Sequence, residues 1–166
     1  MFRNILVAVD GSSAADLALT HAIDLAQSGR ARLTLFTAIA RPPRFGYWGF
    51  AAPEMIRFSE HAEAEAEKIA LRARDRVPDD VSVAGVLTRK PARTALVRQI
   101  SDGHHDLVVL GSSGGGAVRS AMLRSVTHHA LHQSPVPVLV VHAEPSAGSV
   151  LAEGTPVAHG SGSEAA

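Results

Sequence analysis

The residues best suited to chemistry form a glycine- and serine-rich run, GSSGGG, at positions 111–116. Its glycines let backbone N–H groups approach an anion closely. The hydroxyls of Ser112 and Ser113 add hydrogen-bond donors, and the N-terminus of the helix expected to follow favours negative charge. The run therefore predicts a phosphate site, although a flexible turn between a strand and a helix explains the same residues.

The same run also matches G-x-S-x-G, the pattern around the nucleophile of α/β hydrolases, with Ser113 as the nucleophile. Such an enzyme needs an acidic residue downstream, and no Asp or Glu lies between Ser113 and Glu144. An acid taken from a flexible tail cannot be positioned for catalysis. A Ser113 hydrolase is therefore the weakest hypothesis. The run also lacks the Gly-Lys-Ser/Thr ending of a Walker A loop and the dinucleotide fingerprint.

Histidines and aromatics form two further groups. His128 and His132 have the i, i+4 spacing of zinc peptidases, but no Glu follows the first histidine, so we expect a solvated helix face and no metal site. One loop, at 45–50, holds four aromatic residues, and we expect it to fold back over the end of the sheet; a lid or a partner-contact patch are the alternatives. These four are Phe45, Tyr47, Trp48 and Phe50.

The elements that would position the glycine-rich run alternate between strand and helix patterns. Strands are expected at 2–9, 31–39, 81–87, 106–110 and 136–141. Helices are expected from about 14 to a stop at Gly29, at 54–77, from Pro91 onward, and up to about 133. This order predicts a mostly parallel, doubly wound α/β sheet with helices on both faces. Ligands of such sheets bind beyond the carboxyl ends of the strands, where residues 10–13 and 111–116 both lie.

Composition bounds the class of protein. The chain has 166 residues, 46% hydrophobic and 19% charged, with 16 basic against 16 acidic residues and no cysteine. It therefore has no disulfide, thiolate metal site or Cys nucleophile, and no basic excess of the kind that nucleic-acid binders show. No apolar run is long enough for a membrane span, and no signal peptide is evident, so we expect a cytoplasmic protein. Residues 1–143 read as one domain and residues 144–166 as a flexible tail.

Over residues 1–142 the sequence resembles the universal stress protein family. The resemblance rests on ILVAVDGS at 5–12, DLVVLG at 106–111, Ser125-Val126, and PVPVLVV at 135–141. It implies a five-stranded sheet of order 3-2-1-4-5. It also implies a homodimer in which the last strands pair through Val136, Val138 and Val140. Many members bind ATP through Gly, two residues, Gly, nine residues, then Gly-Ser or Gly-Thr.

Carried over position by position, that motif places Gly111 and Gly114 at its first two glycines and Ser125 at its final hydroxyl. The resemblance implies that Asp10 meets the ribose or the adenine edge, and that Val9 and Ala38 border the base. ATP, with or without Mg²⁺, is the implied ligand. The full set of implied nucleotide-binding residues is Ala8, Val9, Asp10, Ala38, Leu110, Gly111, Gly114, Gly115, Arg124, Ser125 and Val126.

Arg124 departs from the motif, because it stands where ATP-binding members have glycine. A side chain there crowds a phosphate, whereas a guanidinium beside a triphosphate adds charge-assisted hydrogen bonds. Two hypotheses follow: an ATP-binding, dimeric stress-response protein, or a dimeric interaction module that has lost the nucleotide. No residue resembles a positioned general base, so hydrolysis of ATP would at most be slow.

Overall fold

The computed structural model describes residues 1–40, 52–112 and 119–143, and it describes their side chains except at 52–55 and 119–125. Strands and helices alternate through these residues, as the sequence pattern predicts. The elements are β1 (Asn4–Ala8), α1 (Ser13–Gly29), β2 (Arg32–Ala38), α2 (Ala52–Asp75), β3 (Val83–Thr88), α3 (Ala92–Asp102), β4 (Leu107–Ser112), α4 (Arg119–Gln133) and β5 (Val138–His142).

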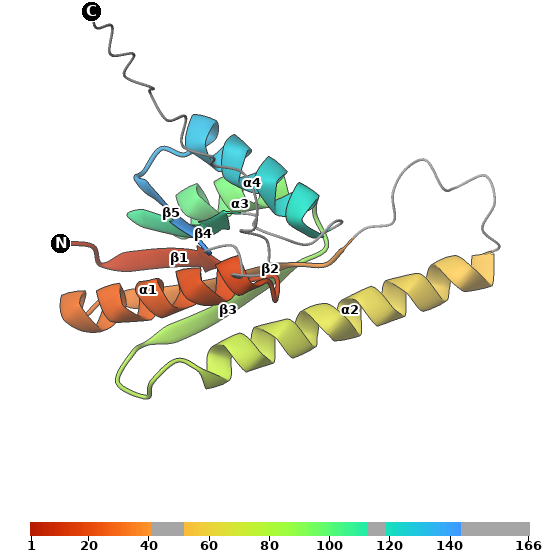
Figure 1. Ribbon diagram of the computed structural model, residues 1–166, viewed down its shortest axis with the longest axis horizontal. Coiled ribbons are helices and arrows are strands. Elements are labelled where there is room, and N and C mark those ends of the chain that lie inside the picture. Colours follow the sequence, from red (N-terminus) through yellow and green to blue (C-terminus); the bar gives the residue numbers. More distant parts are fainter. Residues whose placement is uncertain (41–51, 113–118, 144–166) are drawn as a thin grey trace, which may run out of the picture.

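The five strands form one parallel sheet in the order β3-β2-β1-β4-β5 (Figure 1), which confirms the expected topology. β1 is the central strand: Val7 lies opposite Leu35 of β2 on one side and opposite Val109 of β4 on the other. The order reverses between β1 and β4, because the chain winds first toward β3 and then toward β5. That reversal is the place where ligands of such sheets bind.

Helices cover both faces of the sheet, with α1 and α2 on one side and α3 and α4 on the other (Figure 1). Alternate β1 residues supply the two cores. Ile5 and Val7 pack in the cluster that includes α1, whereas Leu6 and Ala8 pack in the cluster that includes α3 and α4. Because both faces of β1 are buried, its sequence reads as a continuous apolar run.

The ends of α1 are defined by specific caps. The Ser12 hydroxyl accepts a hydrogen bond from the Ala15 N–H at 3.2 Å and so caps the first turn. At the other end the left-handed residue is Arg30, with φ 50°, and its N–H contacts the carbonyls of Ala26 and Gln27. Gly29 is the last helical residue; a Cβ there would lie 3.2 Å from the Phe2 carbonyl oxygen. The helix therefore ends at the predicted position, but the residue with the left-handed backbone is Arg30 and not Gly29.

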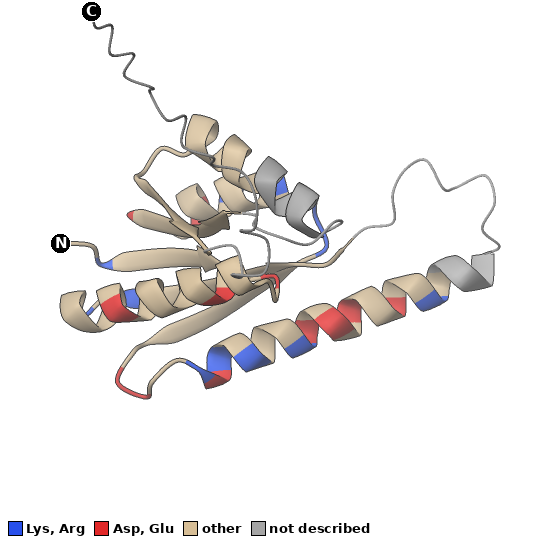
Figure 2. Ribbon diagram, in the orientation of Figure 1, with Lys and Arg blue, Asp and Glu red and all other residues tan. Residues whose placement is uncertain are grey.

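α2 is a 24-residue helix that reaches well beyond the sheet (Figure 1). Its last turn carries Arg72 and Arg74, which complement the negative end of the helix dipole, and acidic residues gather in its middle part (Figure 2). Ala62 and Ala66 pack against Ile39, while Leu71 is 62% exposed on the outer side. Glu63 forms an ion pair with Arg89, which follows β3, and this pair links the helix to the far edge of the sheet.

Each strand differs from its predicted range by one or two residues at either end, and the two largest consequences are at β4 and β5. β4 continues through Gly111 and Ser112, so the glycine-rich run begins inside a strand. β5 begins at Val138 rather than at 136. The aromatic loop at 45–50 and the tail at 144–166 lie outside the described residues. Among the helices that are described, none has the length and apolar character needed to cross a membrane.

Candidate functional site

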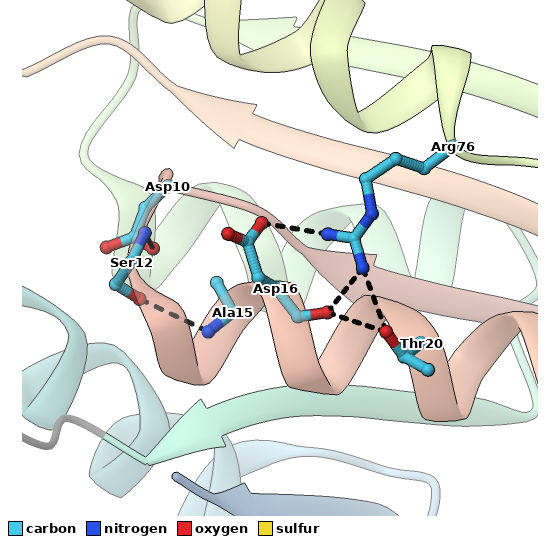
Figure 3. A network of polar contacts seen from close by, with 6 residues as sticks. All are labelled: Asp10, Ser12, Ala15, Asp16, Thr20 and Arg76. Carbon is cyan, nitrogen blue, oxygen red and sulfur yellow. Dashed lines mark hydrogen bonds and ion pairs between the residues drawn. The ribbon is translucent and has the colours of Figure 1, made fainter. Parts of the chain in front are cut away.

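The turn after β1 is built around Asp10. Its Oδ1 atom accepts a hydrogen bond from the Ser12 N–H at 3.0 Å, while Gly11 adopts φ +79° (Figure 3). This is an Asx turn with a glycine in the left-handed region, which other residues rarely adopt. The turn leaves the Asp10 carboxylate half-buried at the carboxyl end of β1 and starts α1 immediately afterwards.

α2 packs directly on this turn. A Cβ on Gly11 would lie 3.2 Å from Ile69 Cγ1, so the turn and the helix are in contact. Just beyond α2, Arg76 reaches the first turns of α1: Nη1 is 3.0 Å from Asp16 Oδ1, and Nη2 donates to Asp16 O at 3.1 Å and to Thr20 Oγ1 at 2.8 Å (Figure 3). These contacts hold α2 against the start of α1.

Gly111 is held between two helices at the end of β4. A Cβ on Gly111 would lie 2.5 Å from Ala14 C and 2.7 Å from both Ala14 O and Ala15 N, all backbone atoms of α1. Its carbonyl oxygen accepts a hydrogen bond at 3.2 Å from the hydroxyl of Thr127 in α4. The absence of a side chain at Gly111 is therefore explained by close packing of β4 on α1. From the sequence, we had expected this glycine to let the backbone N–H groups approach an anion closely.

The carboxyl ends of β1 and β4 lie side by side. Since Val7 is opposite Val109, Val9, just after β1, lies at the level of Gly111, and β4 continues to Ser112. The two segments that the sequence singled out, 10–13 and 111–116, therefore start next to each other at the point where the strand order reverses.

The predicted site residues divide between the two faces of the sheet. Four of them belong to, or pack against, the core cluster on the α3 and α4 side, and we call these four residues the apolar floor. They are Ala8, Ala38, Leu110 and Val126. The Val9 side chain lies in the opposite cluster, and the Val9 N–H donates to Phe36 O at 2.9 Å. Val9 could therefore meet a ligand on this floor only through its backbone.

Part of the predicted phosphate site lies outside the residues that the structure describes. Gly114 and Gly115 fall outside the described residues, as does Ser113 of the hydrolase hypothesis. Arg124 and Ser125 belong to α4, but their side chains are not among those described. In the same helix, sequence reasoning missed Thr127, which is a buried polar residue. The available signal was a hydroxyl residue two positions after Ser125 in a helix with a buried face.

His105, which the sequence placed in a plain loop, is buried at the opposite end of the sheet. Its Nδ1 atom lies 3.0 Å from Asn4 Oδ1, and Asn4 Nδ2 donates to the carbonyls of Gly103 and His104. His105 Nε2 is buried without a hydrogen-bond partner. Burial lowers the pKa of His105, more than the Asn4 contact and the Asp106 charge raise it. This network joins the starts of β1 and β4 and is structural.

The histidines of α4 do not assemble a larger cluster in the described part of the chain. The rings of His128 and His132 lie 4.6 Å apart, centroid to centroid. Nowhere within residues 1–40, 52–112 and 119–143 do three or more potential metal-ligating side chains come together.

Comparison with known proteins gives consistent matches. The model of the universal stress protein family matches residues 1–142. A universal stress protein of Thermus aquaticus is 35% identical over 142 residues, which cover 85% of this chain and 99% of the relative. Among solved structures, a universal stress protein in complex with cAMP has 24% identity and a TM-score of 0.59, with 85% of this chain and 97% of that one covered. An Arabidopsis thaliana family protein with AMP bound has 14% identity and a TM-score of 0.61, with coverages of 87% and 93%.

Proposed function

This chain belongs to the universal stress protein family, and from that premise we propose that it binds ATP where β1 and β4 diverge and acts in the stress response through nucleotide-dependent conformation or partner binding. The observation that carries the proposal is the adjacency of the Asp10 turn and the carboxyl end of β4. The turn of Asp10 and the end of β4 lie side by side, and three predicted site residues beside them, Ala8, Leu110 and Val126, belong to one apolar cluster.

The chemistry of these groups suits an adenine nucleotide. Ala8, Leu110 and Val126 are at most 6% exposed, so Ala38, which is half-buried, is the residue of this set with side-chain surface for a base. Asp10 uses one oxygen for the Ser12 N–H, and a carboxylate has further lone pairs that can accept from a ribose hydroxyl or an adenine amino group. The phosphates would be held by Gly111, Gly114, Gly115 and Ser125, as the family motif implies. Solved family members that carry cAMP and AMP support an adenine site in this fold.

Arg124 decides how tightly such a site holds the phosphates. A bulky residue at a position where ATP-binding members have glycine favours a second function, a dimeric interaction module without nucleotide. We favour retained but weakened binding, because the other three motif positions, Gly111, Gly114 and Ser125, are present. On this proposal Arg124→Gly binds ATP more tightly than the natural chain does.

Calorimetry with ATP, AMP and adenosine, each with and without Mg²⁺, tests the proposal on the natural protein and on Arg124→Gly. Micromolar binding by the natural protein that tightens in the variant supports it. No heat from either form, while the dimer stays intact, would favour the interaction module. Mass spectrometry of small molecules released on denaturation shows independently whether a nucleotide is carried through purification.

We also propose that β5 pairs with β5 of a second copy, as the family resemblance implies. β5 is the edge strand, and β4 is its only partner strand in the described chain. Its residues carry no Lys, Glu or Pro between Val138 and Val141, the usual protection of an exposed edge. Leu139 is 38% exposed, so Leu139→Lys should be tolerated by the fold and should weaken the dimer. A monomeric mass for the natural protein at micromolar concentration would contradict this pairing.

A further inference from the structure

We propose that Thr127 is a positioning residue that fixes α4 relative to the end of β4 and thereby sets the affinity of the site for the phosphates of its ligand. This inference rests on the proposed nucleotide binding and deepens it. Its basis is one buried contact: Thr127 is 7% exposed, and its hydroxyl donates to the Gly111 carbonyl oxygen at 3.2 Å.

The contact joins two segments that the chain connects only by a long excursion. Thr127 and Gly111 are 16 residues apart, and the residues between them include the segment that leads from β4 into α4. Gly111 cannot shift toward α1 to accommodate a movement of α4, because its Cα already packs on the backbone of Ala14. The end of β4 is therefore a fixed reference, and the Thr127 hydroxyl ties α4 to it.

Ser125 lies two residues before Thr127 in the same helix, so the position of its backbone depends on how α4 is placed. Val126 between them packs into the apolar floor, and this contact needs no hydrogen bond. A helix that loses the Thr127 hydrogen bond keeps its apolar contacts with β4, but its register against the Gly111 carbonyl is no longer fixed by this bond. We therefore expect the loss of this hydrogen bond to weaken the binding of the phosphates and to leave the binding of the base nearly unchanged.

A purely structural hydroxyl would behave differently. If the hydrogen bond to Gly111 only satisfies the buried hydroxyl of Thr127, replacement of Thr127 lowers stability and changes the affinity for all adenine ligands by a similar factor. A positioning role instead makes the change in affinity depend on the number of phosphates. The two cases are separated by a comparison of ligands, not by stability alone.

The test compares Thr127→Val, which keeps the shape and removes the donor, with Thr127→Ser, which keeps the hydroxyl. Calorimetry measures ATP, AMP and adenosine on both variants and on the natural protein, after circular dichroism has shown that each is folded. We expect Thr127→Val to weaken ATP binding by about three- to tenfold, the range for one hydrogen bond, and to leave adenosine within about twofold. Thr127→Ser should stay close to the natural protein for all three ligands.

Equal losses for ATP and adenosine, or unchanged ATP binding in Thr127→Val, would overturn the positioning role while nucleotide binding itself stands. If the natural protein binds none of the three ligands, the proposed function fails, and the role of Thr127 fails with it. Should Thr127→Val not fold, Thr127→Ala takes its place in the same comparison, with Thr127→Ser again as the control.

Discussion

Replacement of Gly111 by alanine tests the packing at the end of β4. The added Cβ would lie 2.5–2.7 Å from three backbone atoms of Ala14 and Ala15, distances that real Cβ atoms essentially never show. Neither neighbour is the end of a flexible side chain, so relief requires α1 and β4 to move apart along a tightly packed face. Gly111 is not in the left-handed region, since Gly11 is the only glycine with positive φ among the described residues. Any loss of stability therefore reports contact and not backbone strain.

Overpacked cores lose roughly 1–3 kcal/mol, and a clash with backbone belongs at the upper end of that range. We expect Gly111→Ala to lower the free energy of unfolding by about 3 kcal/mol in the absence of any ligand. For a domain of this size such a loss lowers Tm by roughly 6–12 °C. Urea unfolding followed by circular dichroism, together with a thermal scan, measures both quantities.

Gly85 offers the matched control, because it is also a strand glycine and a Cβ there would meet nothing within 4 Å. Gly85→Ala should be neutral or stabilising by up to roughly 0.5–1 kcal/mol, since glycine loses more chain entropy than alanine on folding. A Gly111→Ala protein as stable as the natural chain would refute the packing argument. The glycine at this position would then be explained by close approach to a phosphate alone.

Three further predictions follow from contacts described above. Because burial lowers the pKa of His105, the unfolded chain binds a proton more readily than the folded chain. Stability should therefore fall as the pH drops below about 6.5, the ordinary value, and this dependence should shrink in His105→Gln. Urea unfolding between pH 5 and 7.5 measures it, and an unchanged slope in the variant would contradict the prediction. Arg76→Ala should lower the free energy of unfolding by only about 0.5–1 kcal/mol, since the Arg76 and Asp16 side chains are 40% and 61% exposed. An equal loss in Arg76→Lys would show that the contacts made by both Nη atoms matter, and not the charge alone. Gly11→Ala should lower the free energy of unfolding by roughly 1–2 kcal/mol, because a side chain at φ +79° is strained; an unchanged Tm would contradict this.

The architecture was predictable because its signals are local. Apolar runs such as that of β4 and the three- and four-residue spacing of α1 are visible in short windows of sequence, and right-handed crossovers leave few ways to assemble them. Boundaries were less certain where glycine occurs in a strand. Gly111 and Ser112 were assigned to a loop, yet both pair with β5, because tertiary packing on α1 makes glycine favourable at the end of β4.

The candidate site was predictable only as far as its residues are close in sequence or shared with the family. Asp10, Gly11 and Ser12 form the expected turn before a helix. The roles of Gly111 and His105 depend on partners about 100 positions away, Ala14 and Asn4, and spacing along the chain says nothing about such contacts. Thr127 was missed for a related reason: its partner is a backbone carbonyl, which leaves no trace in the residue type at position 111.

The position of β1 in the middle of the sheet has a consequence for synthesis on the ribosome. β1 is translated first, but its neighbour β4 begins only at Leu107, about 100 residues later. At about 5–20 residues per second, one edge of this strand, apolar from Ile5 to Ala8, stays unpaired for roughly 5–20 s. During that interval the nascent chain offers an open β edge to other chains, so cotranslational binding by a holdase chaperone would protect it at the stage when it is most prone to aggregate.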